Sequence, residues 1–377
     1  MPDPDTSAPV EAMPTDVALC IDPDAYRRLR PVLKHLCVAM IDYNVTMLVL
    51  SSSAEVAGLT FGPIRMMTYE RPLWPADRLR LARQYRFREV LDRLAERPPD
   101  IVHAVSAGSF EAARWLAERF DLDLVVHLTT FEDVDRLWPA LIDRTTAFIV
   151  GSRPIMDRLE ELVAPSHAEV SLIRPGLLAG TEPTCFSKPE GTPAVLCSEG
   201  FRPGAGVDRL LQAARILLDR KREFLMFLTG TGPIESDLRR QAKALRLAST
   251  VIFARPTGDL ERVVTGADIY VEPSVDPTLS AGPIHAMANG MAVIAVDGGA
   301  ADCFVDGVTA LVCPDNRAER LADAIERILD DRAFAVRLAT GAINHIRQFH
   351  TISNMAEQTV ERYRSLLARR RTYAMGS

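Results

Sequence analysis

Short apolar runs rich in β-branched residues alternate with amphipathic segments along almost the whole chain. Such runs, bounded by turn residues, are typical of strands buried on both faces, and the segments between them have helical spacing. The pattern predicts an α/β protein in which helices cover both sides of parallel sheets. The predicted strands of the first half span residues 16–22, 45–51, 64–70, 100–106, 124–130, 147–152 and 170–176, with a helix at 76–96.

A second alternating series follows in the other half of the chain. Its predicted strands span residues 194–199, 224–230, 250–256, 268–274, 292–298 and 310–314. Its predicted helices lie near 207–220, 233–246, 257–266, 281–289 and 317–330, and residues 332–371 are almost wholly helical in pattern. Two doubly wound domains that face each other across a cleft are therefore expected, with ligands at the carboxyl ends of the strands.

The domain boundaries follow from the breaks in this pattern. The stretch between the two series is rich in glycine and proline and has no periodicity, which predicts a linker. The predicted division is a disordered tail at 1–15, an N-terminal Rossmann-like domain at 16–176, a linker at 177–192, a C-terminal Rossmann-like domain at 193–350, and a C-terminal helix at 351–377 that packs back toward the first domain.

Composition narrows the class of protein. The chain has 377 residues, 47% of them hydrophobic, and a net charge of -6, which gives no basic field for nucleic acid. Six scattered cysteines without a C-x-x-C pair predict reduced core residues of a cytoplasmic protein. The sequence has no run of 18 uncharged apolar residues, so no membrane-spanning helix is expected. No pair of histidines and carboxylates has the spacing of metal ligands. Neither a metal nor a cofactor is expected.

Two arginine-rich segments leave the question of membrane contact open. The predicted helix at 78–97 has a basic outer face, and "LLARRRTY" at 366–373 ends the chain's last helical pattern. A basic amphipathic helix can meet anionic lipid, so peripheral membrane contact is one interpretation. A solvated helix face is the other, because acidic residues dilute the charge toward the end of the first segment.

Three stretches of the second half carry a family resemblance. They are "LTGTGPIESDLRRQAKALRLASTVIFARP" at 228–256, "ADIYVEPS" at 267–274, and the segment at 285–331 that begins "HAMANGMAVIAVDGG". Together they resemble the donor-binding domain of the GT-B glycosyltransferases of family four, glycosyl transferases group 1. The first half agrees in order through "PPDIVHAVS", "LVVHLTTFED", "TTAFIVGS" and "VSLIRPG". The resemblance implies two Rossmann-like domains facing across a cleft.

The resemblance also implies which residues the donor site has lost. Family members hold the nucleotide diphosphate with an arginine and a lysine and contact the sugar and ribose with two glutamates; the cations stand where the leaving group develops charge. Here Gly200 and Ala205 take the cation positions, and Pro277 and His285 take the glutamate positions. In the first domain Thr129 stands where the family has a histidine. Losing both cations removes roughly 3–6 kcal/mol, or about 10²- to 10⁴-fold in donor affinity.

The framework of the site is kept while its charges are lost. Gly230 and Gly232 form a G-x-G turn after a predicted strand, and Ser280 is placed to cap the helix that begins near Ala281. The glycine-rich loop expected after the first strand is replaced by "DPDAYRRLRP", whose side chains would crowd a phosphate.

Several residues have both a functional and a structural interpretation. Arg202 would restore diphosphate binding if its loop shifts by two residues, or it is an exposed loop arginine. Glu272 would replace a lost carboxylate, although it lies in an apolar strand. His285 is either an acid or base or a helix-face histidine. His103 and His127 lie near strand ends, as ligand-lining residues or as hydrogen-bonded core histidines.

Three functional hypotheses follow. The leading one is a non-catalytic or specialised partner of an active glycosyltransferase in glycan or glycolipid assembly, such as that of bacterial polysaccharide. The second is an active retaining hexosyltransferase that uses a nucleotide sugar with Arg202, Glu272 and His285. In the third, helix-terminal amides near Ser280 and Ala281 bind another anionic metabolite.

Overall fold

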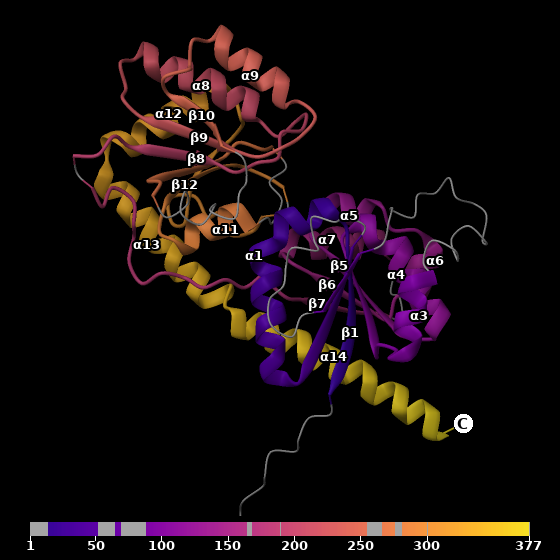
Figure 1. Cartoon of the computed structure of the whole chain (residues 1–377). Coiled ribbons are helices and arrows are strands. Elements are labelled where there is room, and N and C mark those ends of the chain that lie inside the picture. The colour runs from indigo at the N-terminus through magenta and orange to yellow at the C-terminus, as the bar shows by residue number, and fades with distance from the viewer. Residues whose placement is uncertain are drawn as a thin grey trace, which may run out of the picture.

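Each half of the chain folds on a parallel sheet (Figure 1). The structure is a computed structural model and describes residues 14–51, 65–68, 88–163, 168–188, 190–254, 266–275, 281–299 and 301–376. Within this part of the chain the predicted α/β class and the two Rossmann-like domains are confirmed. Every predicted strand is present, most of them shorter because their last residues leave the ladder toward a loop.

The N-terminal sheet has the strand order β3-β2-β1-β4-β5-β6-β7. Its strands are β1 Thr15–Ile21, β2 Val45–Ser51, β3 Arg65–Thr68, β4 Ile101–Val105, β5 Asp123–Leu128, β6 Ala147–Val150 and β7 Glu169–Leu172. All neighbours pair in parallel, and every residue of β4 and β6 is buried. The predicted tail at 1–15 is wrong at its end, because Thr15 already pairs with Val45. Residues 1–13 lie outside the described residues.

Helices flank this sheet on both sides. They are α1 Pro23–Ala39, α3 Arg88–Glu96, α4 Phe110–Phe120, α5 Phe131–Asp135, α6 Pro139–Arg144 and α7 Arg153–Leu162, with 3-10 turns η1 Met40–Tyr43 and η3 Ala107–Ser109. The description of α3 begins at residue 88, so most of the predicted helix at 76–96 and of the basic segment at 78–97 lies outside the described residues.

The C-terminal sheet has the strand order β10-β9-β8-β11-β12-β13. Its strands are β8 Ala194–Cys197, β9 Leu225–Thr229, β10 Val251–Ala254, β11 Ile269–Glu272, β12 Ala292–Val296 and β13 Leu311–Cys313. The helices are α8 Val207–Asp219, α9 Glu235–Ala244, α11 Ala281–Ala288 and α12 Ala318–Asp330. The predicted helix at 257–266 falls almost entirely outside the described residues.

Two long helices return the chain to the first domain. The helical pattern at 332–371 is two helices, α13 Arg332–Phe349 and α14 Ile352–Gly376, which run from the C-terminal domain across the N-terminal one (Figure 1). The break at His350 anchors the linker, because its carbonyl accepts a hydrogen bond from Leu177 N at 2.9 Å and its Nδ1 lies 3.0 Å from Pro175 O. Beyond the break, α14 packs against α1.

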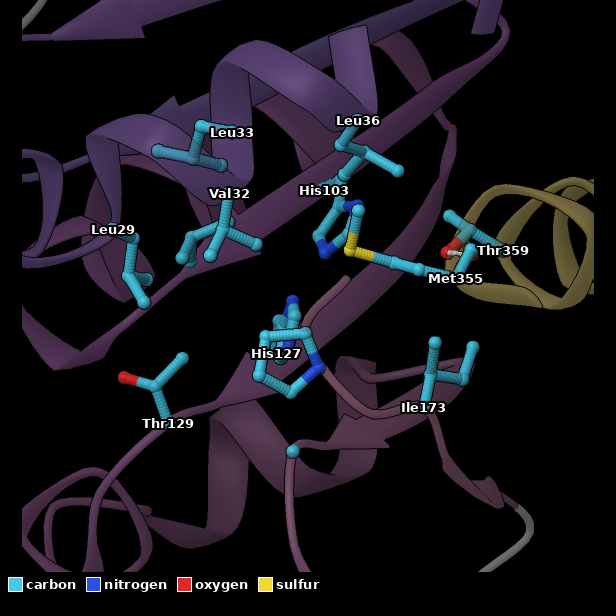
Figure 2. A pocket seen from close by; sticks show the side chains of 13 residues that line it. Leu29, Val32, Leu33, Leu36, His103, His127, Thr129, Ile173, Met355 and Thr359 are labelled. Carbon is cyan, nitrogen blue, oxygen red and sulfur yellow. Dashed lines mark hydrogen bonds between the residues drawn. The ribbon is translucent and has the colours of Figure 1, made fainter. Parts of the chain in front are cut away.

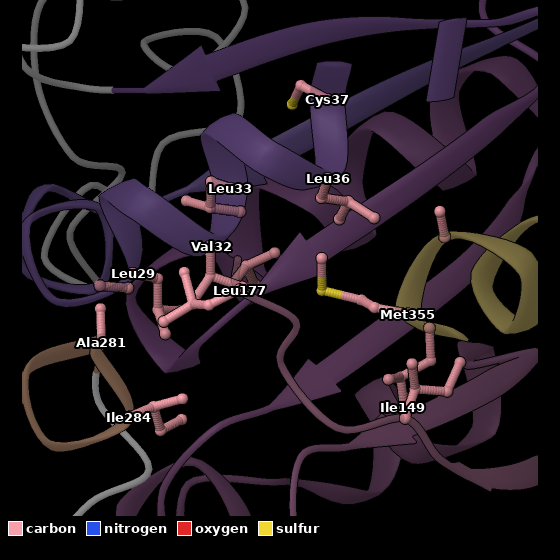
Figure 3. Packing of buried hydrophobic residues seen from close by; sticks show 14 of the residues in the cluster. Leu29, Val32, Leu33, Leu36, Cys37, Ile149, Leu177, Ala281, Ile284 and Met355 are labelled. Carbon is pink, nitrogen blue, oxygen red and sulfur yellow. The ribbon is translucent and has the colours of Figure 1, made fainter. Parts of the chain in front are cut away.

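The two domains share one apolar cluster. Helix α1 packs against α11, so that Leu29 and Val32 of the first domain join Ala281 and Ile284 of the second in the same buried core (Figure 3). At the edge of this contact, Arg174 bridges the domains with an ion pair to Asp302 at 2.7 Å. The interface therefore has an apolar centre and a charged rim.

The cysteines are buried thiols, as their scattered positions without a C-x-x-C pair predict. All six are free and buried. Burial raises the pKa of the Cys20 thiol to about 12 and that of Cys185 to about 11, so these thiols stay uncharged at neutral pH. Within the described ranges no three histidine, cysteine or acidic residues are grouped to hold a metal ion. Among the same residues, no helix is both long enough and apolar enough to cross a bilayer.

Candidate functional site

The loop that follows β8 lies at the carboxyl end of the second sheet, where a ligand is expected. It contains Gly200, Arg202 and Ala205. A Cβ atom built at Gly200 would meet no atom within 4 Å, so space is open there. Ala205, in contrast, is only 1% exposed. Neither Gly200 nor Ala205 carries a charge.

The G-x-G turn supports this loop. A Cβ atom at Gly230 would lie 2.3 Å from Glu199 O, and one at Gly232 would lie 2.1 Å from Phe201 O. The two backbones are also hydrogen-bonded, with Phe201 N donating to Thr231 O at 3.1 Å. Both glycines are thus needed for close contact between two loops, and the structure gives them a supporting role.

Two glycines at the end of this loop differ in one respect. Gly204 and Gly206 both have a left-handed backbone, with φ of 83° and 76°. A Cβ atom at Gly206 would lie 2.1 Å from Pro273 O, whereas one at Gly204 would meet nothing within 4 Å. We expect Gly204→Ala to lower the free energy of unfolding by about 1 kcal/mol, from backbone strain alone.

We expect Gly206→Ala to lower the same free energy by about 3 kcal/mol or more, because the strain is joined by a clash with a backbone carbonyl. Urea denaturation of both variants measures the difference. Equal losses in the two variants would show that the 206–273 contact does not hold the loop.

A pair of buried glutamates lies directly beside this loop. Glu272 is the last residue of β11 and is fully buried, and Glu199 follows β8 and is 6% exposed. Their carboxyl groups are hydrogen-bonded to each other. Burial, followed by the charge of Glu199, raises the pKa of Glu272 well above its ordinary value. The raised pKa favours one proton shared within the pair over two ionised carboxylates.

Hydroxyl and amide groups complete the surroundings of the acid pair. The hydroxyls of Ser198 and Tyr270 lie 2.9 Å apart, and Tyr270 Oη lies 3.5 Å from a Glu272 oxygen. Ser274 N donates to the other Glu272 oxygen at 3.4 Å. Burial raises the pKa of Tyr270 well above its ordinary value, so its hydroxyl stays protonated. A buried, fully polar cluster thus occupies the carboxyl ends of β8 and β11.

Arginines from both domains face Glu199. Arg202 Nη2 lies 3.6 Å from Glu199 Oε2, and its side chain is 48% exposed. Arg28 of α1, in the other domain, also interacts electrostatically with Glu199. The Nη1 atom of Arg28 is buried and has no hydrogen-bond partner in the part of the chain that the structure describes. Burial raises the pKa of Glu199 above the ordinary value, while the positive charges of Arg202 and Arg28 act to lower it.

The start of α1 is closed to phosphate by its own cap. The Asp22 carboxylate accepts hydrogen bonds from Asp24 N and Ala25 N, each at 2.9 Å. It also accepts a hydrogen bond from the Ser106 hydroxyl. These amides are the groups that bind phosphate at other helix N-termini, so here their capacity is already used.

The candidate residues of the first domain, His103, His127 and Thr129, line one cavity in the N-terminal domain (Figure 2). The rings of His103 and His127 stack with centroids 5.5 Å apart. Burial lowers the pKa of His103 well below its ordinary value and that of His127 to about 4, so both are neutral at pH 7. Thr129 donates its hydroxyl to Asp133 Oδ2 at 2.9 Å.

Comparison with known proteins matches the second half of the chain to a family. Residues 183–345 match the family model described as Glycosyl transferases group 1. A D-inositol 3-phosphate glycosyltransferase of Nocardia farcinica is 30% identical over 222 residues, 56% of this chain and 48% of that protein. Another, of a Nocardioides species, is 26% identical over 322 residues, 74% of this chain and 70% of that protein. This chain carries a glycosyl transferases group 1 domain.

Solved structures agree on the fold of the whole chain. HepE of Anabaena, solved with UDP and glucose, superimposes with a TM-score of 0.75 at 16% identity, over 93% of this chain and 100% of that one. A glycosyltransferase from Rickettsia africae gives 0.74 at 15% identity, over 94% and 99%. The two domains therefore form the GT-B fold, as the sequence resemblance implied. In sequence, however, the chain spans only about half the length of several curated relatives it matches.

The predicted donor-site residues of this GT-B chain are brought together only in part. Arg202 and Glu272 both contact Glu199 and so belong to one cluster. His285 is half-buried on α11, one turn after its start. Pro277 and Ser280 fall within 276–280, outside the described residues.

Two residues of the cluster, Glu199 and Arg28, are not among the residues predicted from the sequence. Glu199 ends the apolar run "AVLCSE", and a carboxylate at the carboxyl end of a strand was the available signal. Arg28 gave no signal, because nothing in the pattern of α1 says that this turn faces the other domain.

Proposed function

We propose that this glycosyl transferases group 1 protein does not transfer sugar and works as a specialised partner in glycan or glycolipid assembly. The observation that carries the proposal is the Glu199–Glu272 pair, which stands beside the uncharged positions Gly200 and Ala205. A buried carboxylate at this place repels the diphosphate that family members must hold.

The charges near the pair support this interpretation. Arg202 is ion-paired with Glu199, and the field of Arg28 acts on the same carboxylate. To bind a diphosphate, these arginines would have to leave an anion that is 6% exposed, and leaving a buried charge unpaired is costly. In this proposal Arg202 and Arg28 balance the charge of Glu199 and not that of a ligand.

The related proteins indicate the kind of process involved. They include D-inositol 3-phosphate glycosyltransferases, a glycogen synthase of Mycobacterium tuberculosis and a lipopolysaccharide core mannosyltransferase of Rhizobium leguminosarum. We propose that this chain works beside an active glycosyltransferase of such a process, in the cytoplasm. Contact with a membrane surface through its arginine-rich segments is part of the same proposal.

One observation favours an active enzyme as the second candidate. Arg28 Nη1 has no hydrogen-bond partner among the described residues, so it is available to a ligand phosphate. In this alternative the chain is a retaining hexosyltransferase whose donor diphosphate is held by Arg28 and Arg202 from opposite sides of the cleft. Glu272 and His285 would supply the remaining polar contacts.

A panel of UDP- and GDP-linked sugars tests the proposal, with release of UDP or GDP as the activity readout and thermal shift as the binding readout. We expect no release above background and no shift in melting temperature. Release that Arg28→Gln abolishes would establish the enzyme instead. A shift with inorganic phosphate or simple phosphate esters alone would support a site for another anionic metabolite at the helix that begins near Ala281.

A further inference from the structure

The cavity of the N-terminal domain is a second place where a ligand fits. It has a volume of about 30 Å³ and lies between α1, the carboxyl ends of β4 and β5, and α14 (Figure 2). Its walls are almost wholly apolar, with Leu29, Val32 and Leu36 on one side and Ile173 and Met355 on another. Such a space holds about two water molecules or the end of a small molecule.

Most polar groups on the cavity wall are already used. The Thr129 hydroxyl donates to Asp133, and the Thr359 hydroxyl donates to Met355 O at 2.7 Å. His103 is different: it is 1% exposed, its Nδ1 lies 2.5 Å from Tyr363 Oη, and its Nε2 is buried with no partner within the described ranges. Leaving a buried nitrogen unpaired is unfavourable, so this atom favours a ligand that brings a polar group to it.

The chemistry of the wall selects the kind of group. Both histidines are neutral, and no charged side chain is among the residues that line the cavity. A charged ligand would lose its hydration without gaining a partner of opposite charge. If Nδ1 of His103 donates to the Tyr363 hydroxyl, Nε2 is an acceptor. If Nδ1 accepts from that hydroxyl, Nε2 carries the proton and is a donor. A hydroxyl group satisfies either form, because it both donates and accepts.

We propose that this cavity binds the hydroxyl-bearing end of an uncharged aliphatic alcohol, with the hydroxyl on His103 Nε2 and the carbon chain against α1 and Met355. The site lies in the other domain from the acid pair. It does not depend on whether the chain transfers sugar.

The experiment compares 1-hexanol with its O-methyl ether, 1-methoxyhexane, which cannot donate a hydrogen bond and is bulkier at the oxygen. Binding is followed by titration of the ¹⁵N-labelled full chain, with the imidazole nitrogen resonances of His103 as the site-specific signal. We expect 1-hexanol to bind about fivefold tighter than the ether and to shift the Nε2 resonance of His103.

Matched variants separate the hydrogen bond from packing. His103→Phe combined with Tyr363→Phe removes both partners of their bond together, so that no buried group is left unpaired. We expect the double variant to bind the alcohol and the ether equally, while Tyr363→Phe alone keeps the preference. Equal affinities in the wild type, or an Nε2 resonance that neither compound shifts, would overturn the proposal and leave the cavity to water.

Discussion

Glu272→Gln is expected to stabilise the protein at neutral and alkaline pH. Glutamine has the shape of a protonated glutamate, so it can donate to the Glu199 carboxylate and accept from Ser274 N as Glu272 does. In the wild type the folded pKa of Glu272 is raised, mainly by burial. Between the unfolded pKa of about 4.3 and that folded value, the native state therefore holds one proton more than the unfolded chain.

The direction of the pH dependence follows from that extra proton. The stabilisation is complete below about pH 4.3 and falls as the pH rises toward the folded pKa, by up to about 1.4 kcal/mol per pH unit. The glutamine introduced by Glu272→Gln cannot ionise, so the variant lacks this loss. Its advantage over the wild type should be near zero at about pH 4.5, grow with pH up to the folded pKa of Glu272, and stay constant above that pKa.

Urea denaturation across this pH range measures the difference. Glu182→Gln, at an exposed glutamate of the linker, is the control for loss of a charge and should follow the wild type at every pH. If Glu272→Gln instead tracks the wild-type curve, or is less stable throughout, then Glu272 is ionised in the folded protein and the shared proton does not exist.

Gly200→Arg is expected to create affinity for nucleoside diphosphates. The family resemblance predicts that this position corresponds to the family's arginine, and a side chain there meets no neighbour at its Cβ. A hydrogen bond to a charged group contributes roughly 1.5–3 kcal/mol, so we expect UDP to bind about 10- to 100-fold tighter than to the wild type. Ala205 is unsuitable for the same experiment, because it is 1% exposed and a lysine there would bury a charge.

The control is Gly200→Gln, which adds a long side chain without charge. Calorimetric titration with UDP, at equal protein stability, compares the two variants. A gain in Gly200→Arg that Gly200→Gln lacks would place a diphosphate at this loop. The same affinity in both would mean that residue 200 does not face the diphosphate, and that the family register used for this loop is wrong.

The strands were predictable because each is an apolar run between turn residues. β4 and β12 are entirely buried, and such strands need no contrast between a polar and an apolar face to be recognised. The predicted division between 350 and 351 lies at the break between α13 and α14, although the apolar spacing of 332–371 is continuous across His350. Its role in binding Pro175 and Leu177 depends on the linker being beside it in space.

For the site, the sequence predicts which charged residues are lost, and this stays a prediction. The positions of Gly200 and Ala205 followed from the family pattern, but the acid pair depends on β8 lying next to β11 in the sheet, although the two strands are far apart in the chain. Glu272 accordingly looked like an isolated polar residue in an apolar strand. The role of Arg28 needed still more, since it arises from the packing of α1 against α11 between the domains.

Placement of the two acids gives the cleft a different electrostatic character from a diphosphate site. Burial raises the pKa of both carboxyl groups, and the arginines near them come from opposite domains. Contact between the domains is therefore coupled to the charge of Glu199, and a ligand that opens the cleft must separate it from Arg28. In the proposed function, this coupling keeps the arginines on Glu199 and away from a donor diphosphate.

The affinity of the unmodified chain for UDP and GDP, measured by calorimetric titration at low salt, tests the account most directly. We predict dissociation constants weaker than about 1 mM for both, equivalent to less than about 4 kcal/mol of binding free energy. A dissociation constant near about 1 μM for either nucleotide, weakened by Arg28→Gln and Arg202→Gln, would contradict the account and identify a working donor site.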